Sequence, residues 1–421
     1  MSSSQLQNII SRLKHNPLAK GKKQGVALVM AVTILLFMVY VAKEVSSDSL
    51  IEYVVNSQEL NRVKAYYAAR NGMDVALLRV KIFQQTARLP LPPGMAGELD
   101  QIWKFPFAWP IPIPTETNAI AKDSMAKLNS ESFMDGSYTH TIDDEGSKID
   151  LNDLVSPSKT LRDITKKELL TLFERKIEFD EEFRKNYQSF RFDDLINRIT
   201  DWMSDTDTSA GGGDKKQYFR DLGENYPPNR GFRTIDEMRL VPGMTEEFFA
   251  ILQPQVTIYG MKAINPNTAP ESVLKSLDKG MTDEAVKEAL ARRDNPEQGG
   301  PFKGTDSASC NKDFADFVSS RGARLDPNFS QIPMVCDKVV NFRIKSIGIY
   351  GSGKSAVMKE ITTVVMDLSR SASQIKSYID KEKQQQQQQQ NPGTPAGPTS
   401  ATQKQDPLPK GPPRVVYWLE N

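Results

Sequence analysis

The sequence has no excess of either charge. Its 421 residues include 54 Lys and Arg and 53 Asp and Glu, which gives a formal net charge of +1. A balance this close produces no overall field that would favour nucleic acid or an anionic surface. Charged residues at 25% and hydrophobic residues at 38% indicate an ordinary globular exterior around a modest core, and the length allows two or three domains.

Histidine and cysteine are scarce, with two residues of each. His140 is a lone histidine in a strand-like stretch, and we expect a surface residue rather than a metal ligand. We find no Cys–His or Ser–His constellation and no paired catalytic carboxylates with a cleft, so the sequence does not predict an enzyme or a small-molecule substrate. Cys310 and Cys336 are candidates for a disulfide if they face an oxidising compartment.

Charge is absent from one long apolar run, at residues 26–42. Seventeen residues in a helix cover about 25 Å, close to the ~30 Å hydrocarbon core of a bilayer, so the run predicts a membrane span. It follows a basic leader, which should stay in the cytoplasm and place the rest of the chain across the membrane. The lysines of this leader are Lys14, Lys20, Lys22 and Lys23.

Three interpretations of this run compete. A cleaved signal peptide has little support because no Ala-x-Ala site follows, and Lys43 and Glu44 close the run instead. A plain signal anchor is the second interpretation. The third uses Gly25: basic residues, this glycine and an uninterrupted apolar helix from Val26 resemble the class III leader of type IV pilins and type II secretion pseudopilins. That resemblance implies that a prepilin peptidase cuts between Gly25 and Val26 and methylates the new N-terminus.

The fifth position after that cleavage site is Met30, where most pilins have glutamate. A carboxylate inside a membrane is costly unless it is paired, and in pilins it is thought to pair with the N-terminal amine of an adjacent subunit. A subunit without it is expected at a filament tip, and among pseudopilins minor pseudopilin K typically lacks it. The alternative is that Met30 is an ordinary lipid-facing residue of an anchor.

Proline is absent from residues 43–85, and glycine occurs there once, as Gly72. Apolar residues recur at alternating spacings of four and three, which predicts one helical stripe packed on a folded domain. Residues 65–73 resemble the pseudopilin stretch where the long helix meets the head. Prolines from residue 90 onward end the predicted helix. The stripe consists of Ala69, Met73, Ala76, Val80 and Phe83.

Strands and then an inserted helical region are predicted after this helix. Residues 136–152 alternate as two strands of a hairpin around 143–147, and 149–152 resemble the hairpin that leads out of the pseudopilin sheet. Helical periodicity returns between 157 and 330. In that region 232–252 and 264–274 match the protein K family in order and spacing.

The Pro242-Gly243 segment also resembles helix-hairpin-helix modules, whose hairpin amides bind DNA phosphates. The alternative function is therefore a membrane-anchored DNA-binding protein of a DNA-uptake or type IV pilus system. Phosphate binding needs clusters of Lys and Arg, whereas acidic residues surround this hairpin, so we expect no nucleic acid. The acidic residues are Asp236, Glu237, Glu246 and Glu247.

An acidic loop follows the helical stretch that ends in Asp201-Trp202, as in the protein K family. Ca²⁺ takes about six to eight oxygen ligands, and Asp201, Asp205, Asp207 and Asp214 offer several. The loop is a poor EF-hand, and Ser204 stands where the family usually has an acid. Lys215 and Lys216 lie beside Asp214 and would oppose a cation. Calcium binding and a solvated acidic loop both remain open.

Residues 348–355 match the P-loop pattern G-x-x-x-x-G-K-S through Gly348, Gly353, Lys354 and Ser355. A P-loop needs a following helix to hold phosphate, but the next residues are β-branched and alternate as a strand. The segment is therefore predicted to be a hairpin turn, and nucleotide binding is not expected.

The resemblance covers about 26–369 and 414–419. It implies an α+β fold, with a long pilin-like N-terminal helix packed on a small antiparallel sheet and a large inserted all-α, helix-hairpin-helix-like domain. The expected parts are a cleaved leader (1–25), a membrane part (26–42), a first pseudopilin part (43–155), the inserted domain (156–335), further strands (336–370), a disordered Gln/Pro-rich insertion (371–413) and a terminal strand (414–421).

By the same resemblance, the chain is a minor pseudopilin of a type II secretion system, in the inner membrane with its head in the periplasm. It would form the tip of the pseudopilus and nucleate its assembly for export of folded proteins across the outer membrane. The implied partners are minor pseudopilins I and J, with H as a further candidate, the major pseudopilin G, the prepilin peptidase and the inner-membrane assembly platform. The implied role is structural and not catalytic.

Overall fold

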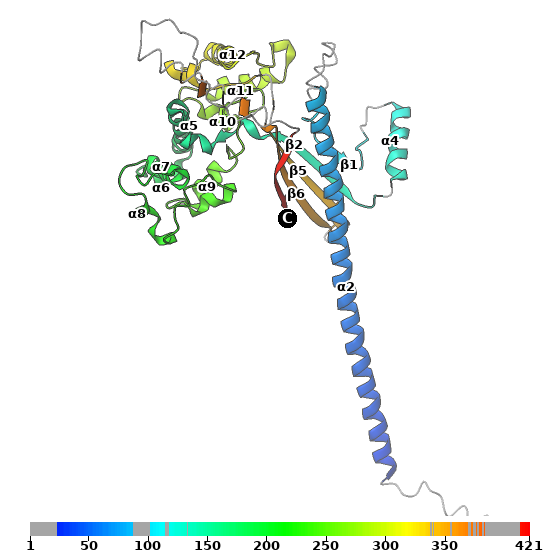
Figure 1. Ribbon diagram of the computed structural model, residues 1–421. Helices are drawn as coiled ribbons and strands as arrows, with labels where there is room; N and C mark the ends of the chain where they lie inside the picture. The colour runs from blue at the N-terminus through cyan, green and yellow to red at the C-terminus, as the bar shows by residue number, and fades with distance from the viewer. Residues whose placement is uncertain are drawn as a thin grey trace, which may run out of the picture.

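A computed structural model describes most of the chain from residue 23 onward. A long helical rod ends in a head, and a group of helices lies to one side of the head (Figure 1). The predicted fold class is confirmed: a long N-terminal helix, a small antiparallel sheet and a large inserted helical region. The described residues are 23–86, 102–113, 118–132, 134–336, 339, 341–353, 356–368, 372, 373, 376, 379, 380, 383 and 413–421.

The rod is helix α2 (Lys23–Thr86), which continues unbroken over 64 residues. Its N-terminal part stands free, whereas its C-terminal part lies across the sheet (Figure 1). The predicted stripe is confirmed, because all five of its side chains, from Ala69 to Phe83, are 8% exposed or less. The apolar run and the head-packing stripe are thus two parts of one helix.

The sheet has the order β1-β2-β5-β6-β7, and all its pairings are antiparallel. Helix α4 (Ala119–Glu131) lies between β1 and β2 in sequence, and the inserted region lies between β2 and β5. The terminal strand predicted at 414–421 is β7, the edge strand beside β6. The strands are β1 (Phe107–Trp109), β2 (Ser137–Asp144), β5 (Asn341–Tyr350), β6 (Val357–Met366) and β7 (Arg414–Glu420).

Small residues let α2 approach the sheet closely. A Cβ built on Gly348 in β5 would lie 2.1 Å from the carbonyl oxygen of Ala65. On the helix side, a Cβ on Gly72 would lie 2.4 Å from Ser346 Oγ. Ser346 Oγ donates a hydrogen bond to the Ala69 carbonyl at 2.8 Å. Helix and strand therefore meet almost backbone to backbone, which only residues with little or no side chain permit.

The hairpin predicted at 136–152 is wrong. Strand β2 pairs with β1 and β5. At its end Asp144 accepts a hydrogen bond from the Gly146 amide at 2.9 Å and caps a 3-10 helix (Glu145–Ser147) that turns the chain out of the sheet. Strand β3 (Ile149–Asp150) then pairs in parallel with β4 (Val256–Thr257) in a separate sheet. The residues after 147 do form a strand, as their alternation predicts, but this strand pairs with β4 of the inserted region and not with β2.

The prediction that His140 lies on the surface is also wrong, since the residue is only 1% exposed. It shares the alternation of Tyr138 and Ile142, and that face of β2 is buried. His140 Nε2 lies 2.7 Å from Arg79 Nη1, and Arg79 also donates to the carbonyls of Ile102 and Phe105. Burial, with the nearby Arg79 charge, lowers the pKa of His140 to about 4. The histidine is therefore neutral. Together with Arg79 it helps to hold the aromatic segment at 102–109 against α2.

The inserted region has a hydrophobic core of its own, separate from the core under α2. Four phenylalanines, Phe173, Phe183, Phe192 and Phe248, lie near its centre with ring centroids 4.3 to 6.2 Å apart. Its helices are α5 (Lys159–Phe179), α6 (Glu181–Tyr187), α7 (Phe192–Met203), α8 (Lys216–Phe219), α9 (Glu246–Leu252), α10 (Glu271–Ser276), α11 (Asp283–Arg293) and α12 (Ser307–Ser320).

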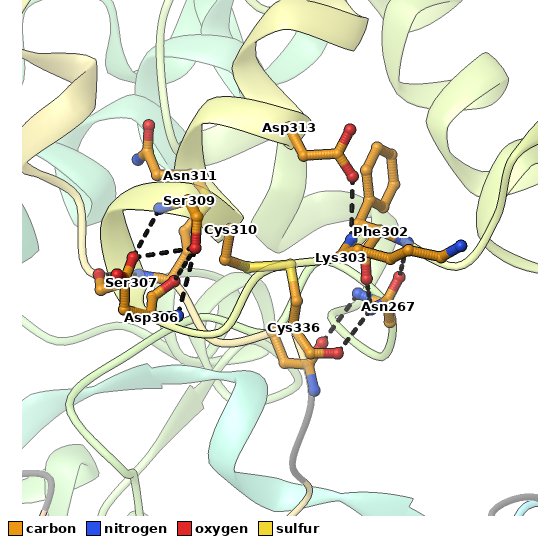
Figure 2. Close-up of a disulfide and its surroundings, with 12 residues drawn as sticks. Asn267, Phe302, Lys303, Asp306, Ser307, Ser309, Cys310, Asn311, Asp313 and Cys336 are labelled. Atoms are coloured by element: carbon orange, nitrogen blue, oxygen red, sulfur yellow. Dashed lines mark hydrogen bonds between the residues drawn. A yellow bond between two sulfur atoms is a disulfide. The ribbon is translucent and has the colours of Figure 1, made fainter.

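Cys310 in α12 and Cys336 form a disulfide, with their Cα atoms 5.5 Å apart (Figure 2). Asn267 holds the backbone beside it. Its Nδ2 donates to the carbonyls of Phe302 and Cys336 at 2.9 Å each, and its Oδ1 accepts from the Phe302 amide at 2.8 Å. The bridge ties the last helix of the inserted region to the segment that returns to the sheet.

Candidate functional site

The free part of α2 exposes large apolar side chains well beyond the predicted membrane run. By length and composition, α2 is the one helix in the described part of the chain that qualifies as a membrane span, with a mean hydropathy of 2.6 in its most apolar window. Between residues 43 and 63 the helix is no longer uniformly apolar, yet the large apolar residues there are well exposed, from 49% at Val63 to 72% at Tyr53. An apolar surface of this size outside the membrane run is typical of a protein contact. These residues are Val45, Leu50, Ile51, Tyr53, Val54, Val55, Leu60 and Val63.

A groove of about 560 Å³ lies where this surface reaches the head. One wall is α2, with Tyr53, Val54 and Ser57, and the other is the start of β6, with Val357 and Met358. Tyr53 is 72% exposed and Met358 is 66% exposed, so the groove is open and has apolar side chains on both walls, while Gln58, Asn61 and Arg62 add polar groups on the α2 side. Such a groove fits a second helix lying alongside α2.

The predicted processing residues lie at the free end of the rod. Gly25 and Val26 fall in the first turn of α2, and a Cβ added to Gly25 would have no neighbouring atom within 4 Å. Met30 is 61% exposed, and Thr33 Oγ1 donates to its carbonyl at 2.9 Å. That bond satisfies the hydroxyl within the apolar run. Residues 1–22 of the predicted leader lie outside the described residues.

A charged joint connects the sheet to the inserted region, and it consists of Asp144, Glu145, Lys148, Thr268 and Arg343. Arg343 in β5 donates to both carboxylate oxygens of Glu145, at 2.6 and 2.7 Å. Lys148 Nζ lies 3.0 Å from Glu145, which has no exposed surface. Burial raises the pKa of Glu145, but the hydrogen bonds and charge of Arg343 and the charge of Lys148 outweigh it, so the net pKa is lowered.

The other acid of the charged joint is Asp144. It accepts hydrogen bonds from Thr268 Oγ1 at 2.6 Å and from the Ser147 hydroxyl. Burial raises the pKa of Asp144 to about 6, although these hydrogen bonds oppose the shift. The sheet and the inserted region are thus held together by buried polar groups as well as by chain connection.

A second ionic cluster lies at the base of the inserted region. Lys262 Nζ lies 2.8 Å from Asp150 and 2.6 Å from Asp153. Burial raises the pKa of nearby Glu168 to about 8, and the Asp153 charge adds to the shift. Burial, with the Asp150 charge, raises the pKa of Asp153 to about 7. Sequence reasoning missed both clusters, since their partners lie up to 198 residues apart.

The acidic loop does not gather its four predicted carboxylates around an open position. Asp201 is fully buried and accepts from Ser209 Oγ at 2.5 Å and from the Ala210 amide at 2.7 Å. Asp214 accepts from the Lys216 amide, while Asp205 and Asp207 are exposed. No group of three or more acidic, His or Cys side chains suited to a metal occurs among the residues that the structure describes. This arrangement does not fit the calcium site, one of the two alternatives left open by the sequence.

The segment that resembles a helix-hairpin-helix module and the segment that matches a P-loop both differ, in their described residues, from a phosphate-binding site. Near Pro242-Gly243, Arg198 Nη1 donates to the Pro242 carbonyl at 3.1 Å and Arg239 pairs with Glu246, so both arginines are engaged. Gly348 lies inside β5 against α2, and Gly353 lies in the turn before β6. Strand β6 follows where a P-loop needs a helix. Lys354 and Ser355 lie outside the described residues.

Two family models match this chain, both described as type II secretion system (T2SS), protein K, at residues 147–261 and 264–318. The chain also resembles one in the crystal structure of the GspK-GspI-GspJ complex from enterotoxigenic Escherichia coli type 2 secretion system. That match has 17% sequence identity and a TM-score of 0.45, and it covers 75% of this chain and 95% of the other. No curated protein sequence matches this chain.

Proposed function

We propose that this chain, which the family models of type II secretion system protein K match at residues 147–261 and 264–318, is a minor pseudopilin that caps the tip of a pseudopilus and starts its assembly. In this proposal α2 crosses the inner membrane and the head lies in the periplasm. The partners are minor pseudopilins I and J first, then H and the major pseudopilin G, on the inner-membrane assembly platform. The role is structural, and the assembled fibre moves folded proteins toward the outer membrane.

The exposed apolar surface of α2 between 43 and 63 is the observation that carries this proposal. A monomer anchored only by its membrane run has no need of large apolar side chains on the next six turns of helix. Neighbouring pseudopilin helices would cover them, and the groove between α2 and Met358 gives such a helix a seat. The area buried on assembly would come from the free parts of the α2 helices, and the inserted region would stay outside these contacts.

Two features favour the tip over an internal position. Met30 replaces the intramembrane carboxylate that internal pilin subunits use for pairing, so this chain offers no such charge to a neighbour's amine. The inserted region also widens the head on one side (Figure 1). A subunit stacked beyond it would have to pass that bulk, whereas a terminal subunit would not.

Copurification tests the proposed contact surface. We expect the detergent-solubilised full chain to retain minor pseudopilins I and J, and Val54→Glu to lose most of that binding, because it replaces an apolar side chain of the groove with a charge that a partner helix would have to bury. Leu128→Glu is the matched control, since Leu128 on α4 is 56% exposed and is not among the residues that line the groove. Equal binding by both variants would contradict the proposal.

Mass analysis of the membrane-extracted protein tests the processing step. The proposal expects an N-terminus at Val26 carrying one methyl group, and a Gly25→Leu chain that keeps its leader. A native protein that still begins with Met1 would remove the basis for placing it in a pseudopilus. A salt-dependent DNA-binding assay on the same preparation is expected to show no binding.

A further inference from the structure

The loop between α7 and α8 contains a lysine that is covered on all sides. Lys215 has no exposed surface, although it lies in a shallow part of the inserted region, close to solvent. Its Nζ donates to the carbonyl of Ser204 at 2.8 Å, where α7 ends. A lysine is rarely covered completely unless its charge has partners.

The nearby carboxylates of the acidic loop favour the charged form of Lys215. Burial lowers the pKa of Lys215, and the charges of Asp201, Asp207 and Asp205 act against that shift. The backbone of Lys215 is part of the same closure, because its amide donates to the Asp207 carbonyl at 3.3 Å. The Lys215 ammonium is thus held by the Ser204 carbonyl at the end of α7, and the Lys215 amide is held by the Asp207 carbonyl across the loop.

The rest of the loop is folded around this group. Thr208 and Asp214 form a β-bridge, and the Ser209 amide donates to the Gly213 carbonyl at 2.9 Å. Gly212 and Gly213 have φ values of 92° and 83°, which residues with a side chain rarely adopt. The chain therefore reverses tightly between Asp207 and Lys215 and returns the lysine to the loop interior.

We propose that the Lys215 ammonium is the resident cation of this acidic loop, and that the loop closes without a divalent metal ion. Carbonyl and carboxylate oxygens that would otherwise serve Ca²⁺ are already committed, to Lys215 Nζ at Ser204 and to Ser209 and Ala210 at Asp201. A tethered ammonium is present in every molecule, so the loop is ordered at any calcium concentration.

Calcium titration and two lysine variants of the full chain in detergent test this proposal. The wild-type protein should give no binding heat with calcium chloride, and its Tm should be the same in excess calcium and in excess EGTA. Lys215→Met should raise amide hydrogen exchange at 204–214 by about tenfold or more, because a charge-assisted hydrogen bond is lost. The control is Lys216→Met, the same change at an exposed neighbour, which should leave exchange in the loop unchanged.

Three outcomes decide the question. Stoichiometric calcium binding to the wild-type chain, or a Tm that falls in EGTA, would overturn the proposal, and so would equal exchange in the two methionine variants. If Lys215→Met does not fold, Lys215→Arg keeps the charge and should retain most of the protection, while the calcium titration of the wild type still decides between the two cations.

Discussion

The sheet makes two large contacts, and their chemistry differs. Against α2 it presents mainly Gly348, Ser346 and a set of apolar side chains, and α2 contributes alanines and a glycine, with His140 and Arg79 as a buried polar pair at one end. Against the inserted region it presents Arg343 and Asp144, which meet buried polar and charged groups. The apolar contact depends on shape, whereas the charged joint depends on paired protonation states. Mutations and pH should therefore affect the two contacts differently.

The largest effect is expected where shape alone decides. Gly348→Val places a branched side chain where even a Cβ would lie 2.1 Å from the Ala65 carbonyl oxygen. We expect a loss of about 4 kcal/mol or more in the free energy of unfolding, because backbone atoms cannot move aside as a side chain can. Thermal unfolding of the full chain in detergent measures it. Lys345→Val, at an exposed position of the same strand, should change stability little, and similar losses in both variants would contradict the close contact.

The charged joint should respond next. Arg343→Met leaves Glu145 buried with Lys148 as its remaining ionic partner, and we expect a cost of about 3 kcal/mol in unfolding free energy. Adding Glu145→Gln should recover part of that loss, because the buried charge is then gone. The control is Lys345→Met, which breaks an exposed pair with Glu360 and should cost under about 1 kcal/mol. A double variant as unstable as Arg343→Met would show that the charge is not the cause.

The buried acids of the second ionic cluster, Glu168 and Asp153, should make the stability of the protein depend on pH. Burial raises the pKa of Glu168 to about 8, so the folded state holds its proton more tightly than the unfolded chain does. This stabilisation is complete below the unfolded pKa near 4.5 and is lost as pH rises through about 8. Between pH ~6 and ~8 we expect a fall on the order of 2 kcal/mol.

Glu168→Gln identifies the source of that fall. The amide keeps the size of the protonated acid but does not ionise, so urea unfolding at several pH values should show a flatter profile and a more stable protein at high pH. Asp153, whose pKa is raised to about 7 by burial and by Asp150, still titrates in this variant and leaves a smaller slope. An unchanged slope would place the pH dependence elsewhere.

The apolar contact was predictable from sequence, and the charged joint was not. The stripe from Ala69 to Phe83 follows from helical periodicity, which is a local property. The pairing of Glu145 with Arg343 joins residues 198 positions apart, and no local pattern signals it. His140 lies between these cases. Its shared alternation with Tyr138 and Ile142 indicates a buried face, whereas its residue type alone favours the surface.

The smallest effect on the stability of the head is expected in the free part of α2, although it belongs to the same helix as the apolar contact. Val54 is 51% exposed and contacts neither of the two main cores, so Val54→Glu should change the free energy of unfolding by less than about 0.5 kcal/mol. Loss of partner binding with an unchanged Tm would separate an assembly surface from a folding surface within one continuous helix. A drop in Tm comparable to that of Gly348→Val would instead mean that residues near 54 support the head, and the exposed apolar surface would then no longer argue for neighbouring subunits.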